Sequence, residues 1–182
     1  PDGGGQESGT NAFGGRRTNV DGHHSGRPGG DMNELEIKLQ GVMRLLAEHR
    51  DHLGQYRSRL KIAGYKLFLD GSPQGKTAWI SRPYEGEKEY RGYPSCTDEE
   101  VRCAMEKALR DNRQILVHCN GDAAAQQMID CYEKALSHTG CPNIHPVMIH
   151  AQLVRKDQLR AMGKLSIMAS FFTAHVFHWG DI

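Results

Sequence analysis

The sequence lacks the patterns that mark two large classes of protein. Its five cysteines are an odd number and include no Cys-x-x-Cys pair, so they indicate neither a disulfide framework nor a zinc ribbon. Reduced thiols in the cytoplasm fit this pattern best. No apolar run approaches the roughly 20 residues of a membrane-spanning helix, and no secretory signal is visible. We therefore expect a cytoplasmic protein without a membrane partner.

The chain also lacks an excess of charge. Its 23 basic and 22 acidic residues leave a net charge of +1. The nearest approach to a basic run is Arg57, Arg59 and Lys61, which is more typical of a solvated helix end. No dense stripe of Lys and Arg alternates with aromatic residues, so we expect no nucleic-acid partner.

Hydrophobic residues make up only 38% of the chain, and the shortfall is local. Residues 1–30 contain ten glycines, and their only clearly apolar side chains are Ala12, Phe13 and Val20. Such a segment cannot bury enough surface to offset the entropy lost on ordering. We predict a loop or disordered segment over 1–30 and a folded region over 31–182.

The folded region alternates helical and strand patterns. An amphipathic helix is predicted from Asp31 to about Arg57, and Thr97 and Glu100 match a capping box at the start of a second helix. The other expected elements are strands at 62–69, 114–118, 146–150 and 165–171, helices at 123–137 and 155–163, and an irregular stretch at 71–95. This order predicts an α/β fold of parallel βα units, as in a barrel or a doubly wound sheet. The continuous apolar runs predict strands that are covered on both faces.

Three candidate ligands sit on these strands. Lys66 lies inside the first apolar strand, while His118 and His150 end the second and third. A buried ammonium has to be paired, neutralised or used in chemistry. Because functional groups gather at the carboxyl ends of parallel strands, we expect the three side chains to converge there. Asp70, four residues after Lys66, is a rival oxygen donor.

Six ordered motifs resemble amidohydrolase family 3, a branch of the metal-dependent amidohydrolases that includes N-substituted formamide deformylases. The resemblance covers about residues 56–181. The motifs are Lys66 to Thr77, Ala78 to Tyr84, Gly92-Tyr93-Pro94, Val117 to Asp122, Ile149 to Gln152, and Ser170 through His175 to Asp181.

The resemblance implies a TIM (β/α)8 barrel, of which this chain would form a part with about four parallel βα units. It implies one or two divalent metals, with zinc the ion that imidazole ligands suit, held by His118, His150 and a carboxylated Lys66. The expected reaction is hydrolysis of a carbon–nitrogen bond, other than a peptide bond, in a small amide or formamide. The metal would lower the pKa of a bound water to about 7 and polarise the scissile carbonyl.

Two features of the family have no counterpart here. The first-strand His-x-His pair is missing, since His23 and His24 are adjacent, and the aspartate general base would follow Ile182. We therefore expect a central fragment of a hydrolase that is inactive alone. The alternative is a non-catalytic α/β remnant or interaction module. Exposed strand edges leave association into a homo-oligomer open.

The resemblance also suggests substrate contacts, each with a plainer reading. The candidates are Asp70, Gln74, Asn120, His175 and Trp179. Asn120-Gly121-Asp122 also fits a turn followed by a helix N-cap, and the segment from His175 to Asp181 also fits a surface loop. Lys66 could extend along the edge of the sheet to solvent. Strand alternation predicts that Cys119 faces away from His118.

Overall fold

A computed structural model describes residues 41 and 44–179 of the 182-residue chain. The chain divides into two compact units, Pro1–Leu45 and Leu46–Ile182. Almost all of the first unit lies outside the described residues. The segment predicted for residues 1–30, and its boundary with the folded region, lie there too.

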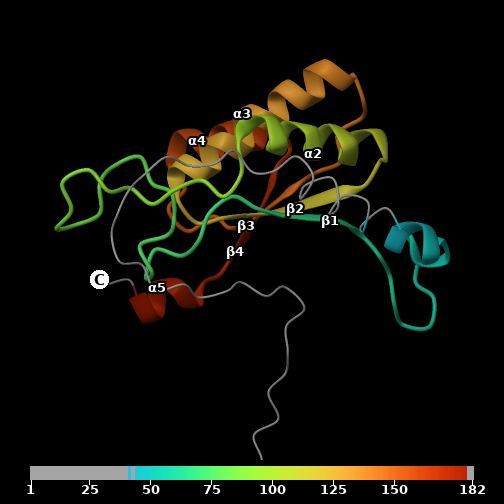
Figure 1. Ribbon diagram of the computed structural model, residues 1–182, viewed down its shortest axis with the longest axis horizontal. Helices are drawn as coiled ribbons and strands as arrows, with labels where there is room; N and C mark the ends of the chain where they lie inside the picture. The colour runs from blue at the N-terminus through green and yellow to red at the C-terminus, as the bar shows by residue number, and fades with distance from the viewer. Residues whose placement is uncertain (1–40, 42–43, 180–182) are drawn as a thin grey trace, which may run out of the picture. The chain divides into compact units, whose positions relative to one another are not determined.

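The second unit alternates strands and helices, with four strands in a single sheet (Figure 1). Its elements are η1 (Arg50–His52), β1 (Gly64–Phe68), α2 (Asp98–Arg110), β2 (Gln114–Cys119), α3 (Asp122–Thr139), β3 (Val147–His150), α4 (Lys156–Lys164), β4 (Met168–Phe171) and α5 (Ala174–Trp179). The strands pair in sequence order and every pair is parallel. This confirms the α/β fold of four parallel βα units, an arrangement consistent with part of a barrel.

One face of the sheet carries the hydrophobic core. Burial alternates along β2, where Ile115, Val117 and Cys119 point into the core. Cys119 thus faces away from His118, as predicted. Helices α2 and α3 pack against each other and against β2, and α4 packs beside α3 (Figure 1). The largest fully buried side chains include Tyr132, Leu69, Met105, Leu109, Met128 and Met148.

The described residues leave the opposite face of the sheet largely uncovered, which makes the prediction of two covered faces wrong for this part of the chain. Lys66 is exposed on that face, and Phe68 and Met168 keep 54% and 45% of their surface. In a closed barrel this face would be lined by the remaining strands. The four described strands do not close into a barrel, and the apolar residues that would fill its lumen are exposed in this structure.

Local signals account for most helix ends. Thr97 and Glu100 form the predicted capping box at the start of α2. Helix α3 ends at Gly140, whose φ of +62° suits glycine and whose N–H bonds the Leu136 carbonyl. None of the helices in the described part of the chain combines the length and apolarity needed to cross a membrane.

Two predicted elements differ from the structure. The amphipathic helix expected to reach Arg57 ends at residue 48, and Leu53 instead forms a bridge with Ile62. Its first part lies outside the described residues. The segment after β4, for which a surface loop was only one of two interpretations, begins with helix α5, which follows β4 at the end of the sheet away from α2 (Figure 1).

Candidate metal and substrate site

Three histidines form a row at the carboxyl ends of the strands. The ring centroids of His118 and His150 lie 4.6 Å apart, edge to face, and His175 stacks on His150 at 5.6 Å. Phe68 and Phe172 flank the row, at 5.3 Å from His118 and 4.5 Å from His175. The structure therefore brings together the two predicted metal ligands and one predicted substrate contact.

The backbone at the end of β3 departs from strand geometry. His150 is in register with Cys119, so strict alternation would turn its ring toward the helices. However, His150 has a φ of +73° and Ala151 a φ of +49°, both in the left-handed region that side chains other than glycine rarely adopt. This break in the alternation accompanies the contact between the rings of His150 and His118. Strained backbone of this kind clusters at functional sites.

Both central histidines have a nitrogen suited to a metal. His150 Nδ1 is buried and has no hydrogen-bond partner among the described residues. Burial first, and then neighbouring His118, His175 and Lys66, lower the pKa of His150 and keep its imidazole neutral. In His118, Nε2 lies 3.2 Å from the carbonyl of Gly71 and 3.0 Å from Asn120 Nδ2. Its other nitrogen, Nδ1, is thus left for a ligand.

Lys66 lies on the same face of the sheet as His118. Phe68 is in register with His118, and the Lys66 ammonium sits 5.0 Å from the centroid of the Phe68 ring. Desolvation lowers the pKa of Lys66. The convergence of Lys66 with the two histidines, and its role as a carboxylated ligand, both stay predictions.

Asp70 acts as a structural centre for the loops around His118. Its buried carboxylate accepts hydrogen bonds from the backbone N–H groups of Trp79 at 3.0 Å, Asn120 at 2.9 Å and Gly121 at 2.7 Å. Burial raises the pKa of Asp70, and these N–H donors oppose that rise. One carboxylate oxygen lies 3.8 Å from His118 Nε2. Its oxygens are largely committed to the backbone, and a contact with substrate remains only a prediction.

Of the other predicted substrate contacts, Asn120 lies beside His118, whereas Gln74 lies on the exposed loop. Asn120 is buried beside His118, and its Oδ1 has no partner among the described residues. Gln74 is exposed on the loop and forms no hydrogen bond with any described residue. Trp179 ends α5, and its side chain lies outside the description. The N-cap of α3 is Gly121, so Asp122 is not the capping residue.

The described residues hold no group of three or more His, Cys, Asp or Glu side chains arranged for a metal ion. Within the described residues, His118, His150 and Lys66 would therefore supply only part of a metal shell. Neutral imidazoles with an anchored second nitrogen are nevertheless the ligand form that divalent metals require.

The structure also shows a polar cluster that was not predicted. Asp122 accepts hydrogen bonds from the Ser81 N–H at 2.8 Å and the Ser81 hydroxyl at 2.5 Å, and forms an ion pair with Arg155 at 2.7 Å. This cluster ties together the loops that follow β1, β2 and β3. Its only sequence signal was the length of the irregular stretch at 71–95, which is typical of a functional loop.

Curated relatives share part of this sequence. The chain is 25% identical over 144 residues to YtcJ of Bacillus subtilis (strain 168), an amidohydrolase by name. The alignment covers 74% of this chain and 27% of that protein. It is also 25% identical over 122 residues to Protein LONG AFTER FAR-RED 3 of Arabidopsis thaliana. That alignment covers 67% of this chain and 21% of the Arabidopsis protein. The chain thus spans only about a quarter of the length of these relatives.

Solved structures and a family model agree with these matches. An uncharacterized metal-dependent hydrolase from Pyrococcus horikoshii OT3 superposes with a TM-score of 0.61 at 32% identity, covering 75% of this chain and 26% of that one. An uncharacterized metal-dependent hydrolase from Pyrococcus furiosus superposes with a TM-score of 0.62 at 27% identity. The match covers 79% of this chain and 32% of that one. The model described as the Amidohydrolase family matches residues 32–182. Since that match spans most of the chain, the protein belongs to amidohydrolase family 3.

Proposed function

We propose that this chain is the central part of a metal-dependent hydrolase that cleaves carbon–nitrogen bonds other than peptide bonds in small amides or formamides. In this proposal the metal is zinc, His118 and His150 are ligands, and a carboxylated Lys66 is a third. Family membership supports the reaction class, and the resemblance to metal-dependent hydrolases supports the metal.

The observation that carries the proposal is the contact between His118 and His150. Two imidazole rings from neighbouring strands meet at the carboxyl edge of the sheet, with ring centroids 4.6 Å apart. A structural histidine would normally satisfy both ring nitrogens, yet the buried Nδ1 of His150 has no partner among the described residues. A metal ligand leaves one nitrogen bare in this way.

The chain's own residues would position the ligands and the substrate. The Gly71 carbonyl holds Nε2 of His118, and the Asp70 carboxylate fixes the backbone on both sides of that contact. Bound metal would supply Lewis acidity toward the scissile carbonyl.

A specific observation favours the second candidate, a non-catalytic interaction module. The open face of the sheet exposes Phe68 at 54% and Met168 at 45%. Apolar surface of this kind favours association with another chain, including a second copy of this one. Metal binding that depends on the two histidines would separate the hydrolase from this alternative.

Titration of Co2+ and Zn2+ into the purified chain tests the proposal. We expect weak binding with a visible Co2+ absorption band, because the ligand shell is incomplete, and no detectable hydrolysis of N-formyl amides. His118→Ala with His150→Ala should abolish the band. His145→Asn, an exposed position with a φ of +48° that asparagine tolerates, is the matched control. Unchanged binding in the double variant would overturn the assignment.

A further inference from the structure

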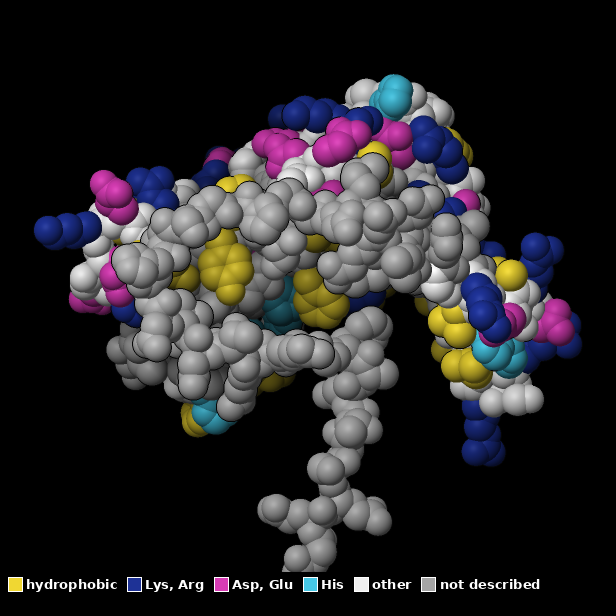
Figure 2. Space-filling model, viewed as in Figure 1, with side chains coloured by type: hydrophobic (Ala, Val, Ile, Leu, Met, Phe, Trp, Pro, Cys, Tyr) yellow, Lys and Arg dark blue, Asp and Glu magenta, His cyan; other side chains and the backbone are white. Residues whose placement is uncertain are grey.

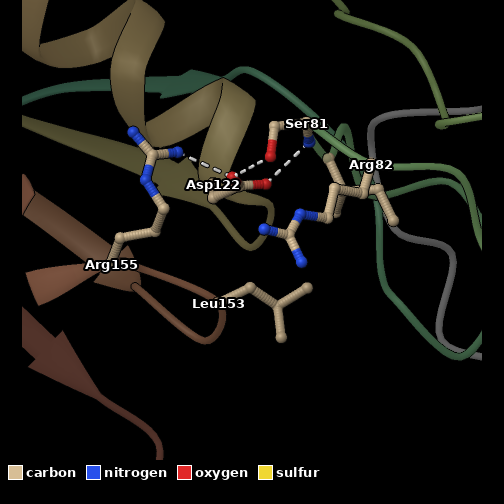
Figure 3. Close-up of a pocket in the computed structure, with 6 residues that line it drawn as sticks. Ser81, Arg82, Asp122, Leu153 and Arg155 are labelled. Carbon is tan, nitrogen blue, oxygen red and sulfur yellow. Dashed lines mark hydrogen bonds and ion pairs between the residues drawn. The ribbon is translucent and has the colours of Figure 1, made fainter.

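A pocket of about 510 Å3 opens between the loops that follow β1, β2 and β3. It is lined by Ile80, Ser81, Arg82, Asp122, Leu153 and Arg155. Figure 3 shows Arg155 reaching Asp122 from one side and the Arg82 guanidinium pointing into the space between Asp122 and Leu153. The volume is in the range of small-molecule sites, about 300 to 1,000 Å3.

The pocket and the candidate site are built on the same loops. Asp122 follows His118 by four residues and Leu153 follows His150 by three. The Leu153 N–H also donates to the Asn120 carbonyl at 2.9 Å, which joins the two loops. A ligand in the pocket therefore lies on the same edge of the sheet as the histidines.

The charges in the pocket leave one cation without a partner. Arg155 is committed to Asp122 at 2.7 Å and to Asp157 at 3.1 Å. Asp122 in turn is satisfied by Ser81 and Arg155, which together outweigh burial and lower its pKa. Arg82 forms no hydrogen bond or ion pair with any described residue. Within the described part of the chain, the Arg82 guanidinium is therefore left for a ligand.

We propose that this pocket binds a carboxylate carried on an apolar group, with Arg82 as its charge partner. A guanidinium matches a carboxylate through two parallel hydrogen bonds. One unpaired cation beside the ionised Asp122 suits a single negative charge better than a phosphate dianion. Ile80 and Leu153 supply apolar walls for the carbon atoms next to the carboxylate.

The carboxylate bound at Arg82 would belong to the amide substrate, and this assignment rests on the proposed function. The substrate class is then an N-acyl or N-formyl compound whose amine part carries a carboxylate. The amide would lie toward the histidines and the acid toward Arg82. Neither binding at Arg82 nor its measurement requires a metal.

This pocket can be tested with two probes. N-formylphenylalanine carries a carboxylate, and N-formylphenethylamine lacks it. Each is titrated into the metal-free chain, with binding followed through the methyl NMR signals of Ile80 and Leu153 and the ring signals of His118 and His150. We expect the acid to shift the signals of both groups and to bind at least about tenfold more tightly than the amine analogue, the gain of one charge-assisted pair.

Arg82→Met should remove that advantage and Arg82→Lys should restore part of it. Arg160→Met, which deletes the same charge from an exposed position on α4, should change nothing. Equal affinity for the two probes, or full affinity in Arg82→Met, would overturn the carboxylate site. Shifts at Leu153 without shifts at either histidine would overturn the assignment to the substrate. These outcomes are independent of the Co2+ titration, which tests the metal ligands alone.

Discussion

The backbone N–H of Gly121 donates a hydrogen bond of 2.7 Å to the buried carboxylate of Asp70, across a sequence separation of 51 residues. The same carboxylate accepts from Asn120 and Trp79. One side chain therefore joins the end of β1, the long loop and the turn before α3. This turn follows directly after His118, so Asp70 fixes the backbone from which the candidate ligand projects.

Asp70→Ala should strongly destabilise the chain. Three buried N–H groups would lose their acceptor, and we expect the free energy of unfolding to fall by roughly 3 to 5 kcal/mol. Asp70→Asn should cost less because its amide oxygen still accepts. Urea unfolding measures both, with Asp130→Asn on the exposed surface of α3 as the control. If Asp70→Ala unfolds at the same urea concentration as the control, this account of Asp70 is wrong.

Gly121→Ala and Gly163→Ala should change stability in opposite directions. A Cβ on Gly121 would lie 1.8 Å from the Trp79 carbonyl oxygen, so the loop must shift, at a cost of about 1 to 3 kcal/mol. A Cβ on Gly163 meets nothing within 4 Å inside α4, and alanine there should add about 0.5 to 1 kcal/mol. Thermal unfolding of the pair checks this. Equal melting temperatures would show that the loop yields without cost.

The sequence was sufficient for the strands and for the position of His118 and His150 at the strand ends, because apolar runs that end in a polar residue are local patterns. It was insufficient wherever a contact joins distant segments. The left-handed backbone at His150 and the ion pair of Asp122 with Arg155 depend on how three loops meet. The open face was not predicted because an apolar strand reads the same in a closed barrel and in an incomplete one.

Lys66 provides a test of the third ligand. If the lysine binds metal as a carbamate, bicarbonate should tighten Co2+ binding to the chain, whereas Lys66→Met should bind on the order of tenfold more weakly and ignore bicarbonate. Acetate should partly restore binding in Lys66→Ala by replacing the carbamate oxygens. Lys88→Met, on the exposed loop, is the control. A bicarbonate effect that persists in Lys66→Met would assign the carboxylation elsewhere.

A charge cluster between α2 and α3 should make stability depend on pH. Glu106 is 5% exposed and accepts hydrogen bonds from His138 at 2.7 Å, Arg102 at 2.6 Å and Arg110 at 2.9 Å. Figure 2 shows acidic and basic side chains interspersed over these helices. The bond from His138 is the largest effect, and together with those from the arginines it outweighs burial and lowers the pKa of Glu106.

Because the pKa of Glu106 is lower in the folded chain than in the unfolded one, its ionised form stabilises the fold above the usual glutamate pKa of about 4.3. This contribution should be lost as the pH falls from about 5 toward the folded pKa. Glu106→Gln should be less stable at pH 7 and converge with the wild type in acid, while Glu133→Gln, exposed on α3, should keep the wild-type slope. Urea midpoints at several pH values measure this. Parallel curves for Glu106→Gln and the wild type would mean that the cluster contributes nothing that depends on the charge of Glu106.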